Sequence, residues 1–113
     1  MINVTPQIIN ALSKIGLKVY NENFLKNESV PCISYYEYDN NIDEYCDIME
    51  YSNIIYHVKV WAKTQKELVD YSAQIDKIMR EQGFKRTGCN DLWTDTLGQR
   101  DLKYKALALE IYE

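Results

Sequence analysis

The sequence predicts a single α+β domain over residues 1–113, with two helices packed on one face of a mostly antiparallel sheet of four to five strands. Residues 53–62 alternate between apolar and mixed side chains, the period-2 pattern of a half-buried strand. Residues 64–83 repeat apolar side chains with period 3.6, the pattern of an amphipathic helix. A strand that runs directly into such a helix creates two apolar surfaces that must cover each other. The length of 113 residues suits one core.

The central strand and helix have well-defined apolar faces and ends. The strand places on one face Ile54, Tyr56, Val58, Val60 and Ala62. The helix stripe consists of Leu68, Tyr71, Ile75, Ile78 and Met79. Thr64 and Glu67 have the spacing of a capping box, in which each side chain serves the other residue's free backbone amide. Gly83 is placed to end the helix.

A first helix is expected to begin at Thr5-Pro6, with Thr5 as its cap and Pro6 at the first helical position. Its apolar stripe consists of Ile8, Ile9, Leu12 and Ile15. Gly16 is expected to stop it, and residues 17–20 follow as a short strand.

The remaining segments complete the order α-β-β-β-α-β-β. Pro31 precedes a strand over residues 32–38. Residues 39–52 form either a long hairpin loop or a strand extension with a mobile tip. Residues 84–87 are a fourth strand or its start, 88–100 are turn-rich, and 101–112 are the last strand. The second and third strands are expected to pair as an antiparallel hairpin.

Composition narrows the class of protein. The net charge of −4 and the pI near 5.0 argue against a general nucleic-acid binder, because phosphate contacts need clustered Lys and Arg. We expect no membrane helix, which needs roughly 20 apolar residues, and no signal peptide. Cys32, Cys46 and Cys89 lack paired spacing, so free thiols in a reducing compartment are expected.

One acidic stretch of the sequence has the spacing of a candidate metal site. Asp39, Asn41, Asp43, Asp47 and Glu50 fall on the ligand spacing of an EF-hand calcium loop. Glu44, however, stands where that loop needs glycine for its sharp turn, and the flanks are strands instead of helices. We therefore expect no metal or other cofactor. The stretch is a solvated acidic loop, or one that meets a basic surface of a partner.

Catalytic chemistry is not expected. His57 is the only histidine and lies in mid-strand, where contact with a sheet neighbour is favoured over a role as a base. The sequence contains no nucleophile elbow, phosphate loop, dinucleotide fingerprint or zinc motif. The sequence is interpreted as non-enzymatic.

Ten tyrosines and several charges suggest an assembly surface. The candidate interface residues are Tyr36, Tyr38, Asp39, Asp43, Glu44, Asp47, Glu50, Lys59 and Lys63. For single tyrosines, strand propensity is the alternative explanation. The lysines form either a solvated face or a basic patch for the acidic stretch of an identical neighbour. Trp93 is expected in the core, with an exposed partner anchor as the alternative.

Several segments together resemble the small tail-completion proteins of long-tailed bacteriophages and prophages, known as tail terminators or head–tail joining proteins. They are the opening helix; Val30-Pro31-Cys32-Ile33-Ser34-Tyr35-Tyr36; residues 51–62 running into the helix that ends Ile78-Met79-Arg80-Glu81-Gln82-Gly83-Phe84; and Tyr104-Lys105-Ala106-Leu107-Ala108-Leu109. The resemblance spans nearly the whole chain.

This resemblance implies structural work in a virion. Such proteins form a ring, commonly of six copies, that ends the tail tube and offers a surface to the head connector. The implied partners are further copies of the chain, the tail-tube protein and the head-completion protein, with DNA only as passing cargo. The implied location is the head-proximal end of the tail, after synthesis in the bacterial cytoplasm. The rival interpretation is a small intracellular adaptor or regulatory protein that binds a partner on an open sheet edge.

Overall fold

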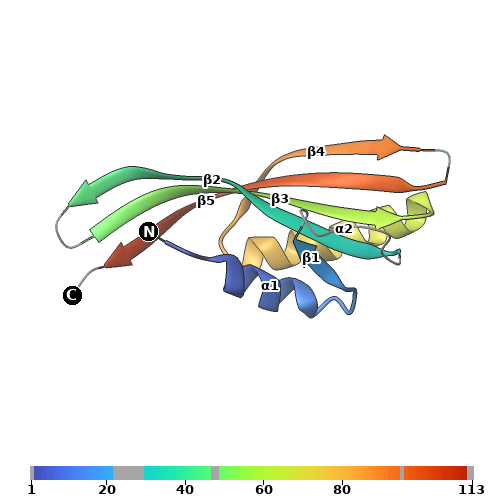
Figure 1. Cartoon of the computed structure of the whole chain (residues 1–113), viewed down its shortest axis with the longest axis horizontal. Helices are drawn as coiled ribbons and strands as arrows, with labels where there is room; N and C mark the ends of the chain where they lie inside the picture. The colour runs from blue at the N-terminus through green and yellow to red at the C-terminus, as the bar shows by residue number, and fades with distance from the viewer. Residues whose placement is uncertain (1, 22–29, 47–48, 95, 112–113) are drawn as a thin grey trace.

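The computed structural model describes residues 2–21, 30–46, 49–94 and 96–111, and for residues 42–46 and 109–111 it describes the backbone (Figure 1). In chain order the elements are α1 (Thr5–Ser13), β1 (Val19–Asn21), β2 (Cys32–Cys46), β3 (Met49–Ala62), α2 (Gln65–Glu81), β4 (Lys85–Trp93) and β5 (Gly98–Ile111).

The strands form one sheet in the order β1-β2-β3-β5-β4. Only β1 and β2 are parallel, and every other neighbouring pair is antiparallel. Both helices lie on the same face of this sheet (Figure 1). The predicted α+β class, element order and β2–β3 hairpin are confirmed. No helix in the described part of the chain is long and apolar enough to cross a membrane.

The core lies between the helices and the inner face of the sheet. All five apolar residues predicted for that face of β3 are fully buried. From the helices, the large apolar side chains that are buried are Ile8 and Leu12 of α1 and Leu68, Ile75 and Met79 of α2. Burying aliphatic side chains of this size stabilises a fold by roughly 1.5–3 kcal/mol each. The two periodicities read from the sequence therefore meet in one hydrophobic layer.

Both ends of α2 follow from its sequence. The hydroxyl of Thr64 accepts a hydrogen bond from the Glu67 amide at 3.2 Å and donates to the Glu67 carboxylate at 3.0 Å. The cap is thus confirmed, although the Glu67 side chain meets the Thr64 hydroxyl and not its amide. At the other end, Gly83 has φ +90°, and the Phe84 amide donates to the Met79 carbonyl at 2.9 Å. This Schellman closure places Phe84 back on the core.

The predicted cap of α1 was wrong. Thr5 is itself the first helical residue, and Val4 occupies the cap position without a side-chain hydrogen bond. The Thr5 hydroxyl instead hydrogen-bonds the hydroxyl of Tyr56 on β3. The Thr5 hydroxyl is therefore used for a contact between α1 and β3, and not for a cap of its own helix.

Three strands extend beyond the helices as an arm, made of β2 from Asp39 to Cys46, β3 from Met49 to Ile55 and β5 from Lys105 to Ile111 (Figure 1). Of the two predictions for residues 39–52, the strand extension is correct and the loop was wrong. The turn between β2 and β3, where the expected mobile tip would fall, lies outside the described residues. The Asn40 side chain donates to the Ile2 carbonyl at 2.7 Å, which ties the N-terminal segment to the arm. Because of the arm the molecule is elongated, with extents of 52 × 23 × 21 Å along its principal axes.

A second hairpin replaces the segment predicted to be turn-rich. β4 continues to Trp93 and β5 starts at Gly98, so most of residues 88–100 is strand. Residues rich in Gly, Asn and Asp have low strand propensity, but here the ladder to β5 and a bulge between Arg86 and Gly88 accommodate them.

Trp93 lies outside the core, contrary to the prediction. It is 42% exposed at the end of edge strand β4. Its register partner is Gly98, and a methyl group at Gly98 would lie 2.6–2.8 Å from three atoms of the indole ring. The indole therefore covers the glycine backbone across the strand pair, a cross-strand rescue that needs no buried pocket.

Gly98→Ala should destabilise the protein by about 1–3 kcal/mol, because the added methyl overlaps the Trp93 ring. Urea denaturation measures the loss. In a Trp93→Ala background the same Gly98→Ala change should cost far less, and equal costs in both backgrounds would contradict the proposed overlap.

Buried tyrosine hydroxyls tie the layers together. The Tyr104 hydroxyl donates to Asp76 of α2 at 3.0 Å, and the Tyr56 hydroxyl donates to Glu37 at 3.1 Å. Burial, opposed by the Thr5 hydrogen bond and reinforced by the nearby Glu37 charge, raises the pKa of Tyr56 to about 12. Burial and Asp76 also raise the pKa of Tyr104.

Stability should therefore fall at alkaline pH. Because the native state holds the Tyr56 proton more tightly than the unfolded chain, this contribution is complete below the unfolded pKa of 10.0 and is lost as pH rises toward about 12. Urea denaturation at about pH 9 to 11.5, which spans this pKa window, measures how steeply the free energy of unfolding falls with pH. Tyr56→Phe should make the slope shallower, with Tyr104 responsible for the part that remains, whereas Tyr38→Phe at an exposed position should leave it unchanged.

Candidate functional site

The sheet face opposite the helices carries a compact group of aromatic and charged side chains. We call it the outer cluster and define it as Tyr36, Tyr38, His57, Lys59 and Asp101. Its members come from β2, β3 and β5. Within the described residues, no helix lies against this face (Figure 1).

Strand register assembles the outer cluster. Tyr36 pairs with His57, and Lys59 pairs with Asp101. A bulge between Glu37 and Asp39 makes Tyr38 the additional residue of β2. The Tyr38 ring stacks on the His57 ring with centroids 4.9 Å apart and planes 9° from parallel. His57 is therefore only 9% exposed on a face that no helix covers.

Polar contacts hold the His57 ring in place. The Tyr36 hydroxyl and His57 Nδ1 are 2.7 Å apart, and the same nitrogen lies 3.8 Å from Asp101 Oδ2. Lys59 Nζ lies 5.7 Å from the centre of the Tyr36 ring. Asp101 Oδ1 is buried without a hydrogen-bond partner among the described residues. The stacked rings therefore form a rigid aromatic platform, and Asp101 Oδ1 lies beside it as an acceptor that receives no hydrogen bond from the described residues.

The platform leaves Tyr38 as its most accessible member. Tyr38 is 63% exposed, whereas Tyr36 and Lys59 are partly buried. A rigid aromatic side chain loses little conformational entropy on binding, which is why tyrosine is frequent at the centres of protein interfaces. The geometry suits contact with another protein surface.

The predicted interface residues do not form one surface. Tyr36, Tyr38 and Lys59 meet in the outer cluster, and Asp39 follows them at the base of the arm. Lys63 is exposed beyond the end of β3, at the opposite end of the sheet. The other predicted members divide into Glu50, which is buried on the arm, Asp43 and Glu44, whose backbone lies in β2, and Asp47, which lies outside the described residues.

Sequence reasoning did not identify Asp101 or the central place of His57. Both point outward from their strands, and the alternation of β5 contains that signal. Only the strand register, however, brings them together.

The EF-hand spacing does not form a calcium loop. Asp39 and Asn41 lie in the β2 ladder, and the Asn41 amide donates to the Asp39 carboxylate at 2.8 Å. Glu50 is buried in β3 and accepts from the Ser52 hydroxyl at 2.6 Å. An extended ladder cannot wrap these oxygens around one ion. In the part of the chain that the structure describes, no three His, Cys, Asp or Glu side chains gather as metal ligands.

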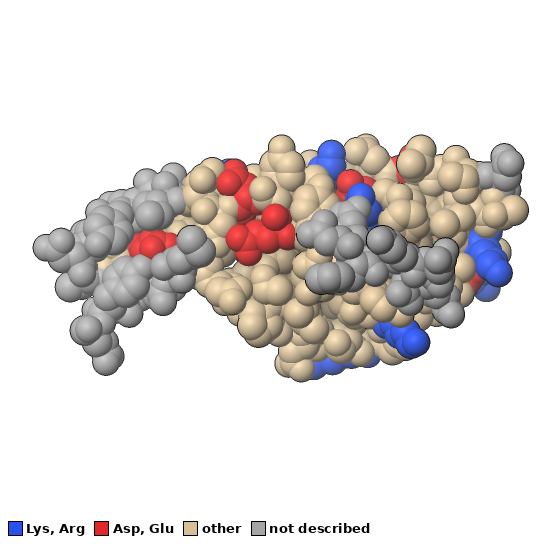
Figure 2. Space-filling view, viewed as in Figure 1, with Lys and Arg blue, Asp and Glu red and all other residues tan. Residues whose placement is uncertain are grey.

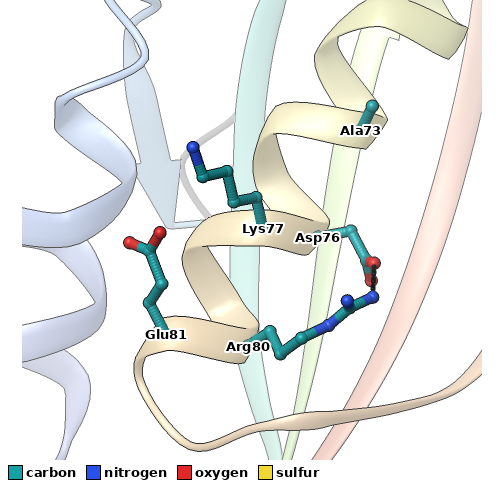
Figure 3. A pocket seen from close by; sticks show the side chains of 5 residues that line it. All are labelled: Ala73, Asp76, Lys77, Arg80 and Glu81. Atoms are coloured by element: carbon teal, nitrogen blue, oxygen red, sulfur yellow. Dashed lines mark hydrogen bonds and ion pairs between the residues drawn. The ribbon is translucent and has the colours of Figure 1, made fainter.

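A hollow of about 420 Å³ on α2 is lined by Ala73, Asp76, Lys77, Arg80 and Glu81 (Figure 3). Asp76 is already engaged, because it accepts from Arg80 at 2.7 Å and from the Tyr104 hydroxyl at 3.0 Å. Figure 3 shows Lys77 and Glu81 directed toward α1, away from this pair. All five lining residues come from α2, so the hollow is a surface groove along that helix.

Comparison of the sequence with known protein families and with curated proteins gives no match. The functional interpretation therefore depends on the residues and geometry above.

Tyr36→Phe should destabilise the protein by about 1 kcal/mol, because His57 Nδ1 loses its partner at 2.7 Å while the ring packing remains. Chemical denaturation measures this loss. Tyr38→Phe retains the stacked ring and should be within about 0.5 kcal/mol of wild type. A loss as large for Tyr38→Phe would show that the hydroxyl of Tyr36 has no special role.

Proposed function

We propose that this protein is a non-enzymatic structural subunit of a phage or prophage tail, where a ring of copies ends the tail tube and joins the tail to the head. The observation that carries the proposal is the division of the molecule into a two-layer body and a projecting three-stranded arm (Figure 1). Such a shape offers neighbouring subunits the strand edges and the open sheet face. The resemblance of the sequence to tail-completion proteins supports the same role.

The surface chemistry is consistent with a partner surface. The outer cluster presents an exposed tyrosine over a rigid base, and such aromatic anchors dominate the binding energy of many interfaces. We assign this face to contact with tail-tube or head-completion subunits. The protein would be made in the host cytoplasm and would act at the head-proximal end of the tail.

Acidic side chains support a role next to passing DNA. In Figure 2, Asp and Glu atoms gather over β2 where the arm leaves the body. The sequence from Glu37 to Glu50 contains no Lys or Arg. Such a surface repels phosphate, so DNA could pass a ring of these subunits without binding tightly.

One observation favours the adaptor alternative. In the described part of the chain, β4 pairs only with β5, and nearly all of its side chains are exposed. An extended peptide of a partner protein could add to such an edge. Lys85, Arg86 and the bulge that follows make this edge less favourable for pairing.

Light scattering on the purified protein, alone and mixed with tail-tube subunits of the same phage, tests the proposal. We expect the mass of a closed ring, commonly a hexamer. The ring forms either in the protein alone or only on the tubes, where the combined surface of ring and tube offsets the cost of association. Tyr38→Ala should weaken tube binding about tenfold or more without loss of fold.

The matched control is Val69→Ala, which removes an exposed hydrophobic side chain from α2, on the helix-covered side of the sheet. A protein that stays monomeric and ignores tubes, but binds an unrelated protein with β4, would favour the adaptor.

A further inference from the structure

A groove of about 460 Å³ opens where β4 joins the edge of β5. It draws its lining from β3, from the turn after α2 and from both strands of the β4–β5 pair. We call it the lysine groove, and its walls include Asn53, Gly83, Lys85, Thr87, Lys105 and Leu107. It shares no residue with the outer cluster.

Two lysines stand side by side in this groove. Lys85 of β4 and Lys105 of β5 are register partners, so their side chains leave the same face of the sheet, and both are exposed. No salt bridge joins either lysine to a carboxylate of the described residues. The next residue, Arg86, has such a partner, because its Nε lies 3.8 Å from Asp76 Oδ1. Like charges directly opposite each other destabilise a strand pair, and an anion between them would remove that repulsion.

The rest of the groove wall is largely apolar. Leu107 is 58% exposed, and Ala106 beside it is half-buried. The side-chain stems of the two lysines add methylene groups. Asn53, the register partner of Leu107, contributes a side-chain amide. A ligand of this groove therefore needs one negative group next to a hydrocarbon segment.

The surroundings of the groove suit a carboxylate better than a phosphate. Phosphate sites commonly use a helix N-terminus or a nest of backbone amides. The helix end that meets this groove is instead the C-terminus of α2 at Gly83, where the carbonyl dipoles oppose a dianion. A nucleic-acid strand would need a longer line of basic residues, whereas Asp39 lies in the same row of the sheet as Lys105.

We propose that the lysine groove is a carboxylate-binding site, in which Lys85 and Lys105 hold an aspartate or glutamate side chain of a partner protein while Leu107 contacts the hydrocarbon groups beside it. The inference rests on the proposed function for its partner, a tail-tube or head-completion subunit, and adds the chemistry of the contact.

The site lies within reach of the exposed tyrosine of the outer cluster. Asp39, the residue after Tyr38, is separated from Lys105 only by Ile55 of β3, a span of two strand spacings or roughly 10 Å. One acidic segment of a partner can therefore contact the Tyr38 ring and the groove together. An exposed ion pair by itself contributes little to affinity, so the groove selects an acidic partner and Tyr38 supplies the anchor.

A heteronuclear NMR titration of the chain alone tests the site. The probe is butyrate, which combines a carboxylate with a short hydrocarbon chain, and butyramide is its uncharged counterpart. Butyrate should shift the backbone amides of Lys85, Thr87 and Lys105 in a saturable manner. Butyramide should bind at least about tenfold more weakly, because it offers no charge to the lysines.

Variants separate the charge from the apolar wall. Lys85→Gln/Lys105→Gln should weaken butyrate binding about tenfold or more. The matched control, Lys14→Gln/Lys66→Gln, removes the same charge from exposed positions at the two helices and should bind like wild type. Wild type should prefer butyrate to acetate by about three- to fivefold, and Leu107→Ser should lose that preference while keeping both lysines.

Three results would overturn the proposal. Equal shifts from sodium chloride at matched ionic strength would show a nonspecific ion atmosphere. Wild-type affinity in Lys85→Gln/Lys105→Gln would place butyrate elsewhere. Tighter binding of inorganic phosphate than of butyrate at the same amides would identify a phosphate site.

Carbodiimide coupling, which joins a lysine to a carboxylate in direct contact, tests the partner on assembled tails. Lys85 or Lys105 should be linked to a tail-tube or head-completion subunit at least about tenfold more than Lys14. Equal linking of all three lysines would overturn the choice of partner. Butyrate binding by a protein that ignores tails would support the site and reject the tail function, whereas a tail-bound ring without butyrate binding would do the reverse.

Discussion

Packing of α2 against the inner face of β3 is the constraint on which the rest of the structure depends. β3 is the middle strand of the sheet, and its inner residues are completely buried beneath side chains of both helices. Since a shift by one residue would exchange the faces of a strand, this packing fixes the register of β3. That register in turn fixes β2 and β5, and hence which side chains meet on the outer face.

Polar contacts make the layers specific. Asp76 accepts from Tyr104 and from Arg80, so one carboxylate joins the helix to the sheet. Arg100 donates two hydrogen bonds to Asp91 at 2.8 and 3.0 Å and a third to Ser72 of α2 at 3.1 Å. The hydrogen bonds from Arg100 also hold the pKa of Asp91 below its usual value. Edge strand β4 is thereby fastened to the body, although it contributes little to the core.

The two faces of the sheet have different surroundings. The helices cover one face of the body, and within the described residues no helix covers the opposite face or the arm (Figure 1). The outer cluster is rigid because its rings support each other, whereas the arm offers backbone edges.

The sequence by itself determined the α+β class, the two helices, the inner face of β3 and the cap at Thr64. These features depend on local periodicity and on residues close in the chain. It left residues 39–52 undecided, mistook 88–100 for turns and placed Trp93 in the core. Those outcomes depend on strand partners distant in sequence: β5 extends the arm, and Gly98 receives the Trp93 ring. The outer cluster was likewise decided by tertiary structure, because only the register across three strands brings Tyr36, His57 and Asp101 together.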